Sequence, residues 1–273
     1  MQLPNSPSWS ESYRANGYFG PRAVFSAQEL LQLNIVPIVR SLDRSDNGWA
    51  RNRHMDHAEI QRLVFDARLV ALVKALIPGD LMLWRTNIFE VPSNGAGFVW
   101  HRDTYPGLVS DELPDERACS IQVNLSSSSS QNAVAVIPGS HRRTDLELVD
   151  QGYVHCPSLG KKGHGSTWGV PRAARQVAIP LLPGECFVFH PCLLHASAKG
   201  RGFSAQIAQA FLRGDRSWFT STSLEDISDA AESAEWRYSI TLRLASPAAI
   251  ISTAAFEECR GRGRVLAWEA IES

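Results

Sequence analysis

Apolar positions recur at helical spacing through residues 1–80 of the chain. Ser26 stands as a helix N-cap, and Glu29 three residues later completes a capping box, so a helix is predicted to begin there. Residues 57–77 also place apolar side chains every three or four positions, which predicts a second helical stretch. Pro78 and Gly79 are expected to end that stretch. The first part of the chain is therefore expected to form a helical buttress.

From Leu81 onward the hydrophobic pattern changes to short segments rich in apolar and aromatic residues. Gly, Pro, Ser and Asn clusters separate these segments, as they do between β-strands. The predicted strands are residues 81–91, 97–103, 119–125, 133–138, 184–190 and 204–213. Helices followed by many strands favour a mostly β fold with flanking helices, an antiparallel sandwich or barrel of the jelly-roll type. The alternation of strands and helices that a doubly wound parallel sheet needs is missing.

The chain reads as a single domain with three parts. Residues 1–80 form the buttress, residues 81–215 the jelly-roll core, and residues 216–273 a C-terminal extension. In the extension, residues 223–236 look helical and residues 236–245 look like a strand. This extension could complete the core, close over a pocket or form a dimer contact. Two longer loops, residues 104–117 and 142–175, are expected to form pocket walls or lids.

Composition indicates a water-soluble protein without an obvious polyanionic partner. The chain has 44% hydrophobic and 20% charged residues and a formal net charge of -1, so neither nucleic acid nor an anionic membrane is expected to bind. No segment resembles a signal peptide or a membrane span. The five cysteines are irregularly spaced, which is typical of reduced thiols. We expect a cytoplasmic protein, a monomer or homodimer, that acts on a small molecule.

The strongest candidate for chemistry is a metal-binding triad of His101, Asp103 and His195. On a strand, residues two apart point to the same face, so His101 and Asp103 could hold one ion together. His195 follows another apolar segment and could supply the third ligand. Two imidazoles and one carboxylate on one side of an iron ion leave positions open for oxygen activation. On this pattern alone, a local hydrogen-bonded surface pair of His101 and Asp103 is an equally good interpretation.

Three segments resemble the phytanoyl-CoA dioxygenase superfamily of iron(II)/2-oxoglutarate oxygenases. They are residues 84–105, residues 121–143 and residues 181–198, which contain His-x-Asp, Pro-Gly-Ser-His and His-x-Ser in that order. The resemblance implies a double-stranded β-helix, a cupin-like jelly roll, with iron(II), 2-oxoglutarate and dioxygen as cofactors. It also implies that His101, Asp103 and His195 are the catalytic metal ligands. The spacing of Arg85, Asn87 and Trp-His-Arg-Asp is most similar to bacterial ectoine hydroxylases and related small-molecule hydroxylases.

Asp103 bears on the type of reaction. Related halogenases replace this carboxylate with a small residue, which frees a coordination position for chloride. Because Asp103 is present, the resemblance favours hydroxylation, or another oxidation such as desaturation or ring formation. The substrate class is expected to be an amino acid derivative or a natural-product intermediate.

The residues that would anchor 2-oxoglutarate depart from the family pattern. The far carboxylate needs a cation, normally an Arg roughly eleven residues after the second His, because Arg binds carboxylates bidentately. That position is occupied by Gln206. Arg85 is the favoured substitute, with Asn87, Ser197 and Gln206 as neutral donors, while Arg201 and Arg213 are alternatives. Arg85 could instead pair with Glu90 or another acid at the surface.

Several other side chains have two open interpretations. Gln122 and Asn124 share a face of one predicted strand, which either lines the pocket or faces water. Trp100 is expected to pack in the core. The aromatic residues Tyr105 and Trp168 are candidates for the pocket wall, although packing elsewhere is commoner for such residues.

Two other classes of function compete with a 2-oxoglutarate-dependent hydroxylase. A cupin-like metal dioxygenase or binding protein would use the same fold without 2-oxoglutarate, and Gln206 favours this reading. A sensor that has lost turnover is disfavoured, because binding alone does not require two histidines and one aspartate around open metal positions.

Overall fold

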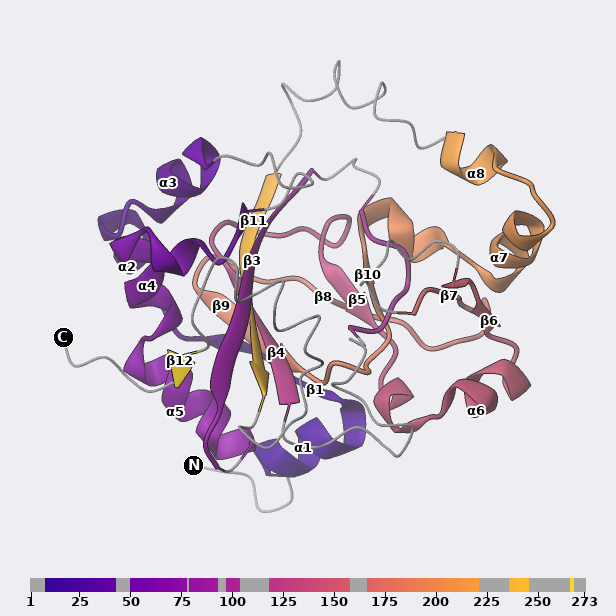
Figure 1. The fold of residues 1–273 in the computed structure, drawn as a ribbon, viewed down its shortest axis with the longest axis horizontal. Helices are drawn as coiled ribbons and strands as arrows, with labels where there is room; N and C mark the ends of the chain where they lie inside the picture. Colours follow the sequence, from indigo (N-terminus) through magenta and orange to yellow (C-terminus); the bar gives the residue numbers. More distant parts are fainter. Residues whose placement is uncertain are drawn as a thin grey trace.

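A computed structural model describes residues 8–42, 50–77, 79–92, 97–103, 118–157, 166–220, 236–245 and 266–267. Helices dominate its N-terminal part and strands follow, as predicted (Figure 1). The N-terminal elements are α1 (Trp9–Asn16), β1 (Tyr18–Ala23), α2 (Ala27–Gln32), α3 (Ile35–Ser41), β2 (Ala50–Arg51), α4 (Ala58–Val64) and α5 (Ala67–Leu76). Within the described residues, no helix has both the length and the apolar character to cross a membrane.

Polar caps divide each predicted helical stretch into two short helices. Ser26 caps α2 and forms the predicted capping box with Glu29. Asn34 then adopts a left-handed conformation, with φ of 51°, between α2 and α3. Asp66 caps α5 by accepting a hydrogen bond from the backbone N–H of Arg68. Side-chain hydrogen bonds therefore set the starts of α2 and α5, whereas a left-handed residue without a side-chain cap hydrogen bond separates α2 from α3.

A seven-stranded sheet forms the centre of the molecule. Its strand order is β1-β9-β4-β11-β3-β12, and β2 also pairs with β3. The further strands are β3 (Met82–Pro92), β4 (Ala118–Asn124), β9 (Glu185–Phe189), β11 (Trp236–Ala245) and β12 (Leu266–Ala267). Strand β11 lies between β3 and β4 and is antiparallel to both, as its position in Figure 1 shows.

Strands from both ends of the chain join this sheet. Strands β1 and β2 join the sheet from residues 1–80, and β11 and β12 join it from residues 216–273. The strand predicted over residues 236–245 is confirmed, and it completes the core. The helix predicted over residues 223–236 falls almost wholly outside the described residues, which resume at Trp236.

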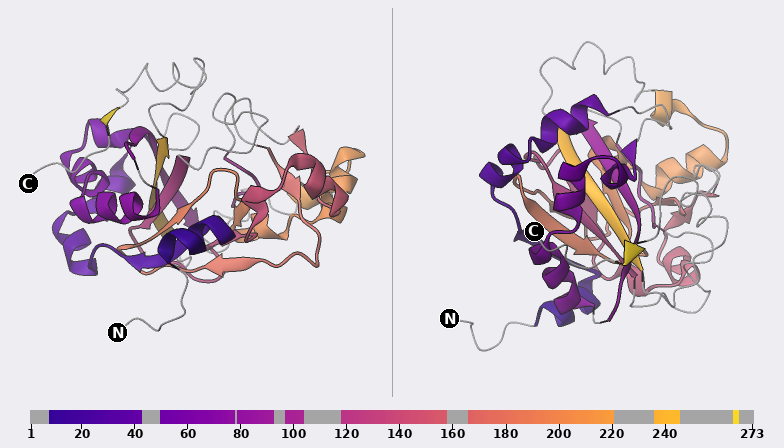
Figure 2. Two further views of the ribbon diagram at one scale, coloured as in Figure 1. Left: turned by 90° about the horizontal axis from the view of Figure 1, so that it is seen from below. Right: turned by 60° about the vertical axis from the view of Figure 1, so that its left-hand side comes forward.

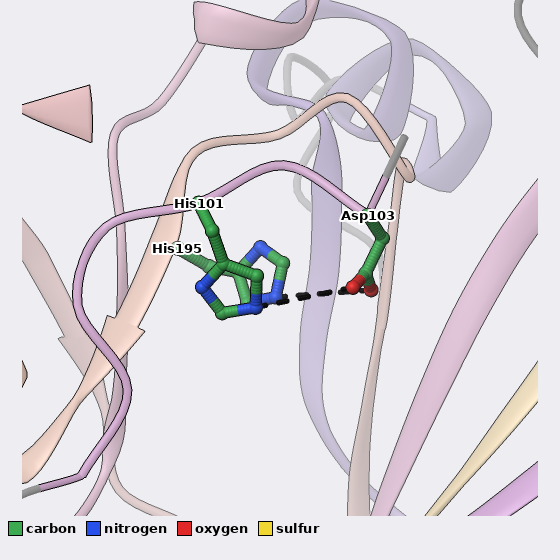
Figure 3. Close-up of side chains that lie close together, drawn as sticks. All are labelled: His101, Asp103 and His195. Atoms are coloured by element: carbon green, nitrogen blue, oxygen red, sulfur yellow. Dashed lines mark ion pairs between the residues drawn. The ribbon is translucent and has the colours of Figure 1, made fainter. Parts of the chain in front are cut away.

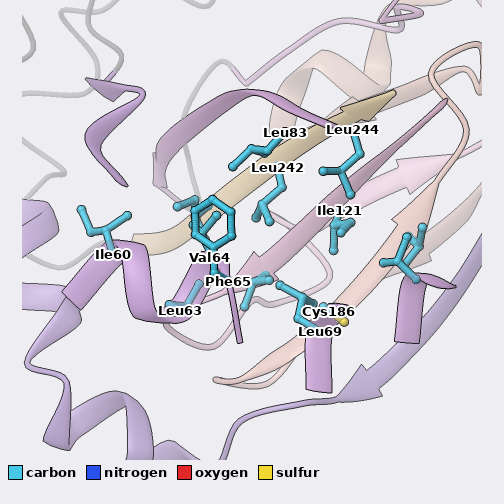
Figure 4. Close-up of a cluster of buried hydrophobic side chains, with 14 of the residues drawn as sticks. Ile60, Leu63, Val64, Phe65, Leu69, Leu83, Ile121, Cys186, Leu242 and Leu244 are labelled. Carbon is cyan, nitrogen blue, oxygen red and sulfur yellow. The ribbon is translucent and has the colours of Figure 1, made fainter. Parts of the chain in front are cut away.

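One face of the large sheet is apolar and packs against the N-terminal helices. Its alternating side chains, among them Ile121, Leu242 and Leu244, contact Ile60, Leu63 and Leu69 of α4 and α5 in one cluster (Figure 4). Apolar burial on this scale is the main favourable contribution to folding. The helical buttress therefore holds the sheet from one side.

The opposite face of the same three central strands is polar, and we call it the polar face. Apolar side chains such as Phe89 and Val91 also lie on this side, so the name covers its polar side chains only, each of which is at least nine-tenths buried. Its members are Arg85 and Asn87 of β3, Ser120, Gln122 and Asn124 of β4, and Arg237, Ser239, Thr241 and Arg243 of β11. Buried polar groups cost free energy unless they are paired, so such a face indicates a functional surface.

A smaller sheet covers part of this side and makes the second layer. It consists of β10 (His195–Ser197), β5 (Val134–Val136) and β8 (Val177–Ile179), in the order β10-β5-β8. Val134 and Ile179 pack with Phe187 and Phe189 of β9. Two facing antiparallel sheets confirm the predicted jelly-roll class, and within the described residues they do not close into a barrel.

A third cluster joins the small sheet to α6 (Asp145–Asp150), β6 (Val154–His155), β7 (Trp168–Gly169), α7 (Ala205–Leu212) and α8 (Ser217–Thr220). These helices lie at the end of the molecule away from α2 to α5 (Figures 1 and 2). Trp100 and Trp168 are completely buried here, so packing is confirmed for Trp100, and Trp168 is a packed residue. A Cβ on Gly169 would lie 2.3 Å from the Cβ of Ala208, so glycine allows β7 and α7 to touch.

Two predicted strands are wrong. Residues 204–213 form α7, because Ser204 caps a helix whose buried residues, Ala205, Ala208 and Phe211, recur every three positions. That spacing is helical and was visible in the sequence. Residues 97–103 are irregular and make only isolated bridges at His101. The strand argument for placing His101 and Asp103 on one face therefore does not hold.

We expect the buried histidines to make the folded protein less stable in mild acid. Burial lowers the pKa of His54 and of His141 to about 4, and that of His190 to about 3. The unfolded chain takes up these protons near pH 6.5 and the folded protein does so only at lower pH. We expect the free energy of unfolding to fall as pH drops from 6.5 to 4, by up to about 1.4 kcal/mol per pH unit for each histidine.

Denaturant unfolding at pH 7 and pH 5 measures this effect. His54→Gln should flatten the pH dependence, because it removes one of these buried histidines. A free energy of unfolding that is constant between pH 7 and pH 5 would contradict the prediction.

Candidate metal centre

His101, Asp103 and His195 meet in one place although they come from separate segments. Their ligand atoms all lie within 4.8 Å of one another, and of the described residues they are the set that could hold a metal ion. His101 and His195 exchange backbone hydrogen bonds at 3.0 and 3.1 Å, and the N–H of Asp103 donates to the carbonyl of Pro191 at 2.8 Å. Backbone pairing between the two segments therefore brings the triad together (Figure 3).

Both imidazole rings are oriented by their own chain. The Nδ1 of His101 donates to the carbonyl of Val99 at 2.8 Å, and the Nδ1 of His195 donates to that of Leu193 at 2.9 Å. Each ring therefore presents the lone pair of Nε2, which lies 3.9 Å (His101) and 3.7 Å (His195) from an oxygen of Asp103. Backbone acceptors on Nδ1 are the usual means of orienting metal-binding histidines.

The protonation states suit a divalent cation. Burial, helped by the neighbouring His195, lowers the pKa of His101 to about 4, and burial also lowers the pKa of His195. Burial by itself would raise the pKa of Asp103, but its neighbours together, the Arg243 guanidinium first among them and then His195 and His101, hold that pKa below its usual range. Two neutral imidazoles and one carboxylate form the donor set that non-haem iron prefers. The residues present thus fit an iron ion.

Arg243 contacts the triad directly and was missed in the sequence. Its Nη2 donates to Oδ1 of Asp103 at 2.9 Å, and its Nη1 contacts Oδ2. The two residues are 140 positions apart. Alternation within the predicted strand 236–245 does place Arg243 on one face with Arg237, Ser239 and Thr241. Nothing in the sequence indicates that this face meets Asp103.

Two of the predicted cofactor-binding residues lie on the polar face. Arg85 and Asn87 of β3 stand opposite Arg243 and Thr241 of β11. Arg85 is 3% exposed, so the alternative of a surface pair does not describe it. Whether it binds 2-oxoglutarate stays a prediction.

The other predicted cofactor-binding residues are placed elsewhere. The hydroxyl of Ser197, on β10, accepts a hydrogen bond from the backbone of Phe98 and so supports the segment leading to His101. Gln206 and Arg213 are exposed on and after α7, away from the polar face. Gln206 was assigned by counting roughly eleven residues on from His195, but that position lies on an exposed part of a helix instead of on a strand. Arg201 is half-buried, and its Nη1 donates to the carbonyl of Ser130.

Arg237 is the second residue that sequence reasoning missed. It lies on the polar face near the start of β11 and is 2% exposed. Its Nε and Nη1 are buried and have no hydrogen-bond partner among the described residues. Burial lowers the pKa of this guanidinium to about 10. A buried cation without a counter-charge is costly, so its presence indicates a site for an anion.

Neutral and aromatic side chains complete the surroundings of the triad. Gln122 and Asn124 are buried on β4, an internal strand, and the amide of Gln122 donates to Asn124 at 2.9 Å, so this face does not meet water. That it lines a pocket stays a prediction. The rings of Phe98 and Phe189 lie 6.1 Å from His101 and 5.0 Å from His195. Tyr105 lies outside the described residues.

The phytanoyl-CoA dioxygenase (PhyH) family model matches residues 39–204, more than half of the chain. Among curated proteins, the ectoine dioxygenase of Streptomyces coelicolor is 31% identical over 171 residues, covering 58% of this chain and 57% of that protein. The ectoine dioxygenase of Nocardia farcinica is 34% identical over 91 residues, covering 33% and 30%. The matches thus span about half the length of these relatives or less.

Solved structures agree on the fold. EctD from S. alaskensis in its apo form aligns with a TM-score of 0.59 and 19% identity, covering 89% of this chain and 78% of that one. The epimerase SnoN, in complex with Fe3+, alpha-ketoglutarate and nogalamycin RO, aligns with a TM-score of 0.62 and 16% identity, covering 97% and 94%.

A jelly roll with two histidines and one aspartate at its centre defines the iron-dependent oxygenase class of fold and site. The chain belongs to the phytanoyl-CoA dioxygenase (PhyH) family, a family of iron- and 2-oxoglutarate-dependent oxygenases.

Proposed function

We propose that the protein is an iron(II)- and 2-oxoglutarate-dependent dioxygenase that hydroxylates an unactivated C–H bond of a small molecule. The observation that carries this proposal is the convergence of His101, Asp103 and His195, with both Nε2 atoms turned toward the carboxylate. Iron would supply the redox chemistry, coupling decarboxylation of 2-oxoglutarate to oxidation of the substrate. Family membership supports the same assignment.

Residues of the chain would bind 2-oxoglutarate at both ends of that molecule. The triad would hold the iron to which the keto acid binds, and Arg237 would bind the far carboxylate. Arg237 supports this role because it is a buried guanidinium on the polar face, and two of its N–H groups have no hydrogen-bond partner within the part of the chain that the structure describes. A bidentate charge-assisted pair of this kind is the strongest carboxylate contact a side chain offers. Arg85 and Asn87 remain candidates for further contacts on the same face.

Arg237 also weakens the case for the competing function. A cupin-like dioxygenase that does not use 2-oxoglutarate was favoured by the neutral Gln206 at the family's arginine position. Arg237 offers a buried cation from another part of the chain, so that reason no longer applies.

Hydroxylation is proposed over halogenation because Asp103 occupies the carboxylate position. The proposed substrate class is an amino acid derivative or a natural-product intermediate. The names of the similar proteins support a small-molecule substrate, since they include ectoine dioxygenases and an epimerase bound to nogalamycin RO.

Anaerobic addition of iron(II) and 2-oxoglutarate tests the proposal. We expect a weak visible charge-transfer band near the green, because the keto acid would chelate the iron. The band should be absent in His101→Ala, which lacks one metal ligand, and present in His155→Ala, which lacks a histidine outside the triad. Binding of iron without any spectral response to 2-oxoglutarate would refute the proposed function and leave the cupin-like alternative.

A further inference from the structure

The guanidinium of Arg243 engages both oxygens of Asp103. Nη2 donates to Oδ1 at 2.9 Å and Nη1 contacts Oδ2, while Nη1 also donates to the hydroxyl of Ser120 at 3.3 Å. Arg243 is 7% exposed and Asp103 is 5% exposed. Arg243 sits on β11 with β3 and β4 paired on either side. The guanidinium of Arg243 is therefore held by the central strands of the sheet, which form a rigid support.

We propose that Arg243 is a positioning residue that restricts Asp103 to binding the metal through one oxygen. The proposal rests on the proposed function, and it concerns how the carboxylate is presented rather than whether a metal binds.

The geometry of a carboxylate explains the restriction. A bidentate guanidinium lies in the plane of the carboxylate and occupies the edge between its two oxygens. A chelating metal ion would need the same edge. With Arg243 there, an ion beside the histidines can reach one oxygen from another direction. The Nε2 atoms of His101 and His195 already lie 3.9 and 3.7 Å from Oδ1 and Oδ2, respectively.

The number of open metal positions depends on this restriction. In an octahedral site, two imidazoles and one carboxylate oxygen leave three positions free. A keto acid that chelates through two atoms takes two of them and leaves one. If Asp103 chelated the metal, only two positions would remain, and the keto acid would fill both. If Asp103 binds through one oxygen, one metal position thus stays open after the keto acid has bound.

Electrostatics argues that Arg243 does not serve metal affinity itself. A positive charge beside the only carboxylate of the triad repels a divalent cation, and burial strengthens that repulsion. The two contacts from the same guanidinium define the orientation of Asp103 before the metal arrives. A positioning role accounts for an arginine at a place where charge alone would disfavour one.

Cobalt(II) binding in the absence of oxygen, followed by titration with 2-oxoglutarate, tests this role without turnover. Arg243→Gln removes the charge and the fork, and Arg243→Lys keeps the charge but cannot grip two oxygens. We expect both variants to bind cobalt(II) within about tenfold of the unaltered protein, and to bind 2-oxoglutarate at least about tenfold more weakly. Asp145→Asn, which removes the acidic partner of another buried arginine, Arg102, outside the polar face, should bind 2-oxoglutarate within about threefold of the unaltered protein.

Each outcome decides the matter. If Arg243→Lys binds 2-oxoglutarate as tightly as the unaltered protein, charge alone suffices and the two-oxygen grip is overturned. If cobalt(II) and 2-oxoglutarate affinities fall in parallel in Arg243→Lys, Arg243 only supports the fold of the site. If the unaltered cobalt protein itself does not bind 2-oxoglutarate, the proposed function fails, and this inference falls with it.

Discussion

Replacing Asp103 with asparagine is expected to lower 2-oxoglutarate-dependent succinate release by about a hundredfold or more. The variant keeps the shape of the side chain but loses the only negative charge in the triad, so two neutral imidazoles would have to hold a divalent ion alone. Succinate release in the presence of substrate, together with direct measurement of bound iron, gives the result.

The same substitution should also destabilise the metal-free protein. Arg243 would keep its buried charge without its acidic partner, and breaking a buried ion pair in this way costs about 3–5 kcal/mol. The double variant Asp103→Asn with Arg243→Gln removes both charges, so we expect it to recover most of the stability and none of the turnover. This separates the loss of a metal ligand from unfolding.

Asp145→Asn is the matched control. It removes another acid that pairs with a buried arginine, Arg102, at 2.7 Å, but Asp145 lies on α6 outside the triad. Turnover should stay within about threefold of the unaltered protein, as expected for one partly exposed ion pair. Iron binding and turnover that survive Asp103→Asn would exclude Asp103 as a metal ligand.

Arg237→Gln is expected to raise the apparent KM for 2-oxoglutarate by about 10- to 100-fold, with a smaller effect on kcat. The estimate follows from losing a hydrogen-bonded contact to a charged group, which contributes about 1.5–3 kcal/mol. Steady-state kinetics with varied 2-oxoglutarate measure it. Because Arg237 is a buried cation without an acidic partner among the described residues, the variant should also be more stable than the unaltered protein when 2-oxoglutarate is absent.

Variants of two other arginines test whether the effect on KM is specific to Arg237. Arg85→Gln tests the anchor favoured by sequence, which lies buried on the same face, and Arg213→Gln tests an exposed residue that should have no effect. A strong rise in KM for Arg85→Gln with none for Arg237→Gln would transfer the anchor to Arg85. A rise confined to Arg213→Gln would contradict both assignments.

Local sequence signals predicted secondary structure correctly where a single short segment determines it. The capping box of Ser26 and Glu29 and the strand over residues 236–245 are present as predicted. The misreading of residues 204–213 had a local cause as well, since an apolar segment of that length fits either a strand or a helix. The spacing of Ala205, Ala208 and Phe211 would have distinguished them.

For the metal triad, the local signal was only partly reliable. His101 and Asp103 were found from a strand argument that the irregular backbone of residues 97–103 does not support. The prediction of the three residues depended on the family motifs, which encode the site regardless of how the backbone presents it. Their convergence is a result of the backbone hydrogen bonds between His101 and His195.

The sequence alone thus determined the class of fold, the three side chains of the triad, and the family to which those motifs point. Only the tertiary structure decided the surroundings of the triad, namely that β11 lies at the centre of the sheet and turns Arg237 and Arg243 toward the polar face. The physical reason is that caps and periodicity act over a few residues, whereas strand order and register depend on which distant segments pair. Arg243 meets Asp103 across 140 positions of chain, a proximity that no local pattern encodes.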